Sequence, residues 1–287
     1  MKLSVSDKIN IIQHTTKYVK VDCMFMYKVS CMKKALYMVL ISMVFSTASF
    51  GVETITIRSD EWMPFNGQPG DTQYPGFTIE IMKMIFEPKG KHIDYQLMPW
   101  ARSIRCVRNG TYDAVIGTTS EEAENLIIPK EPMYILPEDT FYVLKDLDWK
   151  YQGIESLKEI KLGSIAEYKY SNDLNAYIKL FEGTDKIRVE YGERAHLNLI
   201  RALVYGHVNV IIDAPPVFFW EVRRWNIPFD DFQTAGICDN RRSPVYVAFS
   251  PARKTSKTYA DIFDLEIRKL KDSGRYKELL RKYMLDQ

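Results

Sequence analysis

The sequence is poor in the residues that most often build catalytic and metal centres. It contains four His and four Cys in 287 residues, and the His are scattered along the chain. Gly-x-Ser-x-Gly, His-Glu-x-x-His and phosphate-binding glycine loops are all missing. No His lies close in sequence to Cys106 or Cys238. We therefore expect no metal, no cofactor and no enzymatic activity.

Long hydrophobic runs are also missing. The strongly apolar stretch at residues 35–45 spans about eleven residues, too few to cross a bilayer. It follows Lys33 and Lys34 and precedes the small residues Ser49 and Gly51, which is the pattern of a secretory signal peptide. We predict a signal peptide at residues 32–51 and a periplasmic protein. Residues 1–31 are then an extension from a start codon assigned too far upstream, or a genuine N-terminal extension.

A surplus of basic charge is absent once this leader is set aside. Residues 1–51 hold seven Lys and two Asp, so 32 basic and 35 acidic residues remain. No basic stripe argues for nucleic acid, and no other apolar run is long enough to span a membrane. We expect a monomer that binds no nucleic acid and that has no membrane span.

Two of the four cysteines, Cys23 and Cys31, lie in the leader, which leaves Cys106 and Cys238. A secreted chain with two cysteines most simply forms one disulfide, which would contribute about 2 to 5 kcal/mol. The alternative is two buried free thiols.

The rest of the chain alternates strand-like and helix-like patterns, which predicts an α/β fold. Strands are expected at residues 54–58, 92–97, 114–116, 140–144, 161–163, 187–190, 208–212 and 245–249. Helices are expected at residues 77–86, 101–109, 168–181, 194–205, 215–224, 256–271 and 276–283.

One unit of this pattern nearly repeats. A helix, a stop at Gly110 or Gly206 and a short strand occur at residues 102–118 and again at 197–213. Polar stretches at 145–148 and 238–244 are suited to two crossings between lobes. We predict a discontinuous first lobe, residues 52–145 and 239–287, and a second lobe at residues 146–238.

Several landmarks resemble the bacterial extracellular solute-binding proteins of family 3, the receptors of polar amino-acid ABC importers. They are Trp62-Met63-Pro64-Phe65, Gly76-Phe77-Thr78-Ile79-Glu80-Ile81, Gly110-Thr111-Tyr112-Asp113-Ala114-Val115-Ile116, Gly163-Ser164-Ile165-Ala166 and the tail 267–283. Pro99-Trp100-Ala101-Arg102 resembles a divergent branch of that family. The resemblance implies a type II periplasmic-binding-protein fold, in which two α/β lobes joined by two hinge strands close over a ligand cleft. In such a fold Cys106 and Cys238 approach each other.

The resemblance also bears on the ligand. Relatives that bind α-amino acids hold the carboxylate with an Arg about three residues after a strand-end Thr, and hold the ammonium with a lobe-two Asp. Thr118 and Thr119 match the hydroxyl part, but Glu122 stands where the Arg would fall, with Glu121 before it. A carboxylate there repels an α-carboxylate.

The second lobe supplies further candidates. Asp213 matches the lobe-two acid, and it either pairs with a ligand ammonium, caps the helix that begins at Pro215, or does both. Ser164 and Tyr168 fall where the family's second lobe contributes backbone amides and a side chain.

Aromatic and charged residues complete the predicted site. Trp62, Phe65 and Trp100 either line the cleft or pack in the core, with core packing favoured for Phe65. Arg102 either replaces the lost positive charge or lies on the surface. Glu61, Glu121 and Glu122 either make the cleft acidic, which favours a cationic ligand, or are solvated charges at helix starts.

Together these patterns favour a periplasmic protein that captures a small polar solute, an amino acid or amine, and delivers it to an inner-membrane ABC permease. One alternative is an enzyme similar to periplasmic cyclohexadienyl dehydratases, with Glu61 or Glu121 as its acid. The other is a ligand-sensing protein that acts through a signalling partner.

Overall fold

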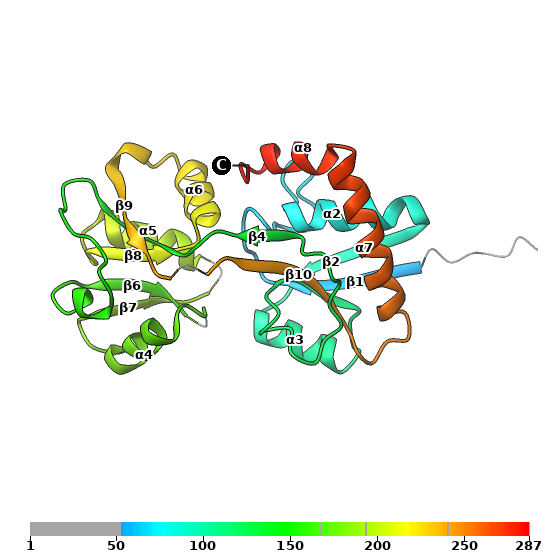
Figure 1. Cartoon of the computed structure of the whole chain (residues 1–287), viewed down its shortest axis with the longest axis horizontal. Coiled ribbons are helices and arrows are strands. Elements are labelled where there is room, and N and C mark those ends of the chain that lie inside the picture. Colours follow the sequence, from blue (N-terminus) through cyan, green and yellow to red (C-terminus); the bar gives the residue numbers. More distant parts are fainter. Residues whose placement is uncertain (1–52, 167, 193, 240, 287) are drawn as a thin grey trace, which may run out of the picture. The chain divides into compact units, whose positions relative to one another are not determined.

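The computed structural model describes residues 53–166, 168–192, 194–239 and 241–286. The expected extension at 1–31 and signal peptide at 32–51 lie outside these residues. The described part forms two five-stranded sheets with helices on their faces, so the predicted α/β class is confirmed (Figure 1). None of its helices is both long and apolar enough to cross a membrane.

The first sheet has the strand order β2-β1-β3-β10-β4. Its strands are β1 (Glu53–Ser59), β2 (Lys91–Leu97), β3 (Ala114–Thr118), β4 (Tyr134–Leu136) and β10 (Ser243–Phe249). β1 is parallel to β2 and β3, whereas β10 is antiparallel to β3 and β4. The associated helices are α2 (Phe77–Phe86), α3 (Trp100–Arg108), α7 (Ser256–Asp272) and α8 (Arg275–Lys282).

Alternating residues of these strands feed two separate cores, because successive side chains of a strand point to opposite faces. Ile116 and Val247 pack with α2 and α7, while their neighbours Val115 and Ala248 pack with α3. The apolar pattern of each strand therefore requires helices on both faces of the sheet.

The second sheet has the order β7-β6-β8-β5-β9. Its strands are β5 (Thr140–Leu144), β6 (Leu162–Ile165), β7 (Ile187–Glu190), β8 (Val210–Asp213) and β9 (Phe232–Ile237). Phe141 and Ile212 pack with α4 (Asn172–Phe181), whereas Tyr142 and Ile211 pack with α5 (Ala195–Val204) and α6 (Pro215–Arg224).

One strand lies in a different sheet from the one expected. Residues 140–144 were predicted to end the first lobe, but β5 pairs with β8 and β9 in the second sheet. The chain therefore crosses between the sheets before Thr140, not at the polar run 145–148. Residues 140–144 are nearly all buried, because β5 occupies an interior position of the second sheet. The return crossing between β9 and β10 is as expected. The Cys238 amide donates to the Asp139 carbonyl at 2.8 Å and links the two crossings.

All the expected helices and strands are present, with small differences at their ends. The helix expected from residue 168 begins at Asn172, because the Ser171 side chain accepts a hydrogen bond from the Leu174 amide and caps it there. Two strands were missed, β4 and β9, which both lie at sheet edges. Gly110 and Gly206 have φ values of 80° and 71°, as predicted.

The predicted disulfide is wrong. Cys106 and Cys238 are both free thiols. Cys106 lies in α3, whereas Cys238 follows β9 and its sulfur hydrogen-bonds to the Ser171 hydroxyl at 3.3 Å. Each thiol therefore belongs to a different part of the fold, and burial raises the pKa of the Cys238 thiol.

Candidate functional site

The loop that follows β1 is fixed by a chain of side-chain hydrogen bonds. The Ser59 hydroxyl donates to the Ile116 carbonyl at 2.9 Å, and the Asn66 amide donates to Ser59 Oγ at 3.0 Å. The Thr78 hydroxyl in turn donates to Asn66 Oδ1 at 2.7 Å. These bonds hold residues 60–67 against β3 and the start of α2, at the carboxyl end of the sheet where α/β proteins bind ligands.

The aromatic residues of this loop divide between core and cleft. Phe65 is fully buried in the first-lobe core, so its predicted ligand contact is wrong and its packing role explains it. Trp62 packs against Phe65 in a tilted arrangement, with ring centroids 4.5 Å apart, and remains partly exposed. Gly117, with φ of 83°, lies under both Asn66 and Trp62, where a Cβ would approach Asn66 Nδ2 to 2.9 Å.

The hydroxyls of Thr118 and Thr119, at the end of β3, form hydrogen bonds within the turn that follows the strand. Glu122 Oε2 accepts from the Thr119 amide at 3.1 Å and from its hydroxyl at 3.2 Å. Thr118 is buried and its hydroxyl donates to the Thr119 carbonyl at 3.1 Å. Glu121 is exposed, and a backbone hydrogen bond lowers its pKa. Glu122 thus closes the turn, while Glu121 does not fit an acid with a pKa raised by burial.

Three side chains of the second lobe form one hydrogen-bonded chain. The Tyr168 hydroxyl lies 2.8 Å from His196 Nε2, and His196 Nδ1 lies 2.9 Å from Asp213 Oδ2. They come from the loop after β6, from α5 and from the end of β8. The Asp213 side chain is completely buried and that of His196 is 14% exposed, so this chain is shielded from bulk water.

The second oxygen of Asp213 accepts from the Ala214 amide at 2.8 Å. Ala214, not Asp213, is the N-cap residue of α6, so the expected capping role is wrong. Burial opposes a charged imidazole, but the charge and hydrogen bond of Asp213 outweigh it and raise the pKa of His196. Asp213 is therefore engaged within its own lobe.

Asp60, immediately after β1, is a site residue that sequence reasoning missed. Burial raises the pKa of its carboxyl to about 6, and the charges of His196 and Glu122 also act on it. Within the described residues it takes part in no ion pair, and its side-chain hydrogen bond is a long one of 3.4 Å from Ser59. Tyr168 feels the charge of Asp60 in turn, so side chains of both lobes share one electrostatic environment.

A second missed acid lies on the first crossing between the sheets. Burial, reinforced by the charges of Asp213 and Asp239, raises the pKa of Asp139 to about 7. Arg241 on the return crossing opposes this shift. Asp60 and Asp139 are thus two acids of raised pKa in this region, whereas Asp213 is paired with His196.

The remaining predicted residues do not gather at this point. Trp100 opens α3 and packs partly against the small core beneath that helix. Arg102 is exposed and has no ion pair among the described residues. Ser164 is fully buried in β6, and its hydroxyl has no hydrogen-bond partner among the residues that the structure describes.

A cavity of about 210 Å³ lies against His196. Its lining includes Arg194 and Leu197 from the second lobe and Glu61 and Gln68 from the first. Glu61 pairs with Arg224 at 3.2 Å, which joins the lobes beside this cavity. Over the described ranges no cluster of His, Cys, Asp and Glu is arranged to hold a metal ion.

One sequence signal pointed to a missed residue. Asp60 directly follows the first strand, at the carboxyl end of the same sheet where Thr118 ends β3. His196 lies within the first turn of α5, but its pairing with Asp213 depends on the helix–strand packing and is not visible from spacing.

The sequence profile of the bacterial extracellular solute-binding proteins, family 3, matches residues 55–286. The chain belongs to this family. The two-lobe fold is that of type II periplasmic binding proteins, as predicted. The assignment to a branch with Pro99-Trp100-Ala101-Arg102 stays a prediction.

Solved structures share this fold at low sequence identity. An ABC uptake transporter substrate-binding protein from Streptococcus pneumoniae with bound histidine has a TM-score of 0.64 and 17% identity, over 80% of this chain and 92% of that one. An amino acid ABC transporter substrate-binding protein from Streptococcus pneumoniae bound to L-arginine has a TM-score of 0.61 and 22% identity, over 80% and 94%. An ancestral amino acid-binding protein, described as a precursor of cyclohexadienyl dehydratase, has a TM-score of 0.61 and 18% identity, over 80% and 94%. No curated protein matches the chain.

Proposed function

We propose that this family 3 protein captures a small cationic solute, one that carries an amine or guanidine, between its two lobes. The observation that carries the proposal is the partly buried carboxylate of Asp60, whose pKa desolvation raises and which forms no ion pair among the described residues. Desolvation of a carboxylate is costly, and a ligand cation within reach would offset that cost.

The arrangement argues against the usual recognition of an α-amino acid. Glu122 occupies the position of the carboxylate-binding Arg and is bonded to Thr119. Asp213, the matching acid for an ammonium, is bonded to His196 instead. A zwitterion would therefore meet a carboxylate near Glu122 and an acid already neutralised at Asp213.

Capture works by closure of the lobes. Asp60 stands on the first lobe, and Tyr168 and His196 stand on the second. A ligand that contacts both sets stabilises the closed arrangement relative to the open one. The partly exposed face of Trp62 suits a cation–π contact worth about 0.5 to 2 kcal/mol.

We infer that the protein works in the periplasm as a monomer after removal of residues 1–51. Its partner is an inner-membrane ABC permease, or a separate signalling protein that reads the closed state. Family membership supports an extracytoplasmic solute receptor.

The test is a thermal-shift and calorimetric screen of the purified protein against putrescine, agmatine, L-arginine, L-glutamine and glutarate. The amine and guanidine compounds should stabilise the protein, and Asp60→Asn should abolish that effect. Stabilisation by glutarate alone, or by L-glutamine with no dependence on Asp60, would refute the proposal.

One observation favours a second function. Asp60, with a pKa of about 6, lies near a Tyr–His–Asp chain, which suits a proton donor at neutral pH. The earlier candidate acids fit less well, since Glu61 is paired with Arg224 and Glu121 is exposed. Incubation with prephenate or arogenate tests this alternative, and absence of turnover removes it.

A further inference from the structure

A larger cavity, which adjoins the one against His196, lies between α6 and the chain around α8. Its volume is about 430 Å³, within the range of small-molecule sites. Its apolar lining consists of Met63, Tyr74, Trp220 and Met284, and the Tyr74 and Trp220 rings meet edge to face at 5.3 Å. Asp60, Tyr168 and His196 do not line it, but it shares Glu61, Met63, Gln68 and Arg224 with the cavity against His196, so the two cavities adjoin.

The charged residues around this cavity leave an excess of positive charge. Four cations line it, Arg223, Arg224, Arg281 and Lys282, against the two acids Glu61 and Asp71.

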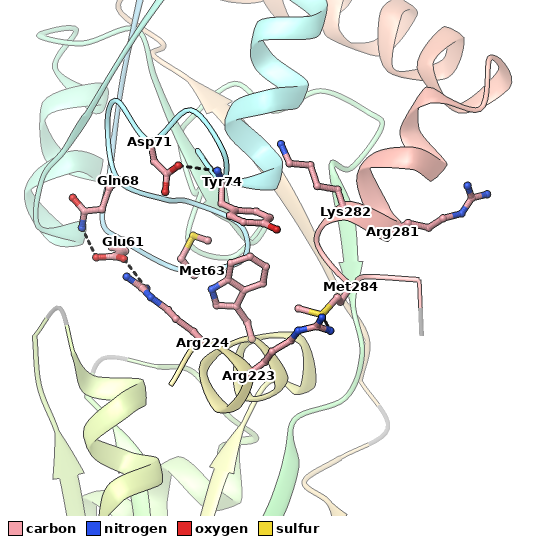
Figure 2. Close-up of a pocket in the computed structure, with 11 residues that line it drawn as sticks. Glu61, Met63, Gln68, Asp71, Tyr74, Arg223, Arg224, Arg281, Lys282 and Met284 are labelled. Atoms are coloured by element: carbon pink, nitrogen blue, oxygen red, sulfur yellow. Dashed lines mark hydrogen bonds and ion pairs between the residues drawn. The ribbon is translucent and has the colours of Figure 1, made fainter. Parts of the chain in front are cut away.

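Both acids, Glu61 and Asp71, already accept hydrogen bonds from groups of the protein. Glu61 accepts from Arg224 at 3.2 Å and from the Gln68 amide, as the dashed lines in Figure 2 show. Asp71 accepts from the backbone amides of Gln73 and Tyr74, each at 2.8 Å. Neither carboxylate neutralises the remaining cations.

Arg223 is the cation with the poorest partner. Its guanidinium lies 2.9 Å from the Met284 sulfur, as Figure 2 shows, and a thioether is a weak acceptor. Among the described residues it forms no ion pair. Lys282 is shared with Glu80, and Arg281 extends away from the cavity in Figure 2. Arg223 is therefore the group that an anion would meet first.

We propose that this cavity is a second binding site, which takes a small organic anion with an apolar or aromatic body and a carboxylate group. The aromatic lining covers the body of such a ligand, and the guanidinium of Arg223 makes a charge-assisted hydrogen bond to its carboxylate. A cationic ligand of the cleft does not fit here, because the same charge repels it.

The position of the site couples it to closure. Trp220, Arg223 and Arg224 belong to α6 of the second lobe, whereas Tyr74, Lys282 and Met284 belong to the first. An anion that contacts both sets favours one arrangement of the lobes. Binding of the anion therefore changes the affinity of the cleft for the cation, and binding of the cation changes the affinity for the anion by the same factor.

The experiment uses phenylacetate as the probe and saturation-transfer NMR with titration as the readout on the purified protein. Phenylacetate should bind saturably, and Arg223→Gln should weaken binding by about tenfold or more, the loss of one hydrogen bond to a charged group. Arg275→Gln is the matched control, since it removes the same charge from an exposed position on α8 outside the cavity.

Absence of saturable binding, or equal binding by Arg223→Gln and Arg275→Gln, would overturn the second site. These outcomes are separate from a failure of the proposed function, which concerns cations and Asp60. A protein that binds no cation but binds phenylacetate through Arg223 keeps this site and loses only the cleft proposal.

Discussion

His196 joins Tyr168 and Asp213 across the interior of the second lobe, with its Nδ1 2.9 Å from the Asp213 carboxylate. Burial alone would lower the pKa of the His196 ring, and the charge of Asp213 raises it. Because the folded pKa lies above the unfolded value, the pair stabilises the fold fully at pH values below the unfolded pKa. That contribution is lost as the pH rises through the folded pKa.

Asp213→Asn should lower the pKa of His196. The substitution removes the charge that raises this pKa, whereas the burial that lowers it remains. Titration of the His196 ring by NMR checks this, with His207, on the exposed surface, as the internal reference. An unchanged His196 titration in the variant would mean that the contact to Asp213 does not set its charge.

Tyr168→Phe should keep the fold but weaken solute binding by about tenfold, because His196 Nε2 loses its partner at 2.8 Å. Calorimetry with the best amine from the screen measures the change. Tyr191→Phe is the control, since that hydroxyl bonds to Glu182 on the surface. Equal affinities for the two variants would exclude Tyr168 from recognition.

Asp139→Asn should stabilise the protein at about pH 8 and have little effect near pH 4. Folding raises the pKa of this acid to about 7, so the folded state is penalised as the pH rises from the unfolded pKa to the folded one. The gain at high pH is at most about 4 kcal/mol. Chemical denaturation at both pH values tests it, with the exposed Asp146→Asn as the control, and a gain of the same size at both values would contradict it.

Gly117→Ala should destabilise the protein by about 1 to 3 kcal/mol and displace Trp62. The new Cβ would lie 2.9 Å from Asn66 Nδ2 and 3.3 Å from the Trp62 ring, at a φ of 83°. Gly153→Ala, at φ of 95° with open space around it, separates backbone strain from the clash. Equal losses for the two variants would show that the contact with Trp62 is unimportant.

Both cysteines should react with iodoacetamide in unfolded, unreduced protein, because Cys106 and Cys238 are free. Mass spectrometry should find a label on each, with Cys106→Ser losing one. Protein without labels at these positions would show a disulfide after all.

Most of the fold could be predicted because its signals are local. Residues 77–86 and 215–224 carry helical periodicity with clear ends, and both helices form at those residues. β4 escaped because its three residues are too few to show an alternating pattern, and β9 because Gln233, Thr234 and Gly236 interrupt its apolar residues. The sheet to which β5 belongs depends on the strands with which it pairs. The polar run that follows β5 in the sequence does not indicate those strands.

The site was predicted less well than the fold. Tyr168 and Asp213 were named and do lie together, but the His196 that joins them comes from a separate helix. Phe65 was named as a candidate ligand contact with core packing favoured, and it is fully buried in the core. Asp60 gained its importance from burial, which no spacing reveals.

The affinity of wild-type protein and Asp60→Asn for putrescine and agmatine, measured by calorimetry from about pH 5 to 8, tests the central claim most directly. Binding should be saturable in the wild type and lost in the variant. It should weaken as the pH falls through the region near 6, where the free Asp60 takes up its proton. Cation binding that is equal in both proteins and independent of pH would contradict the account.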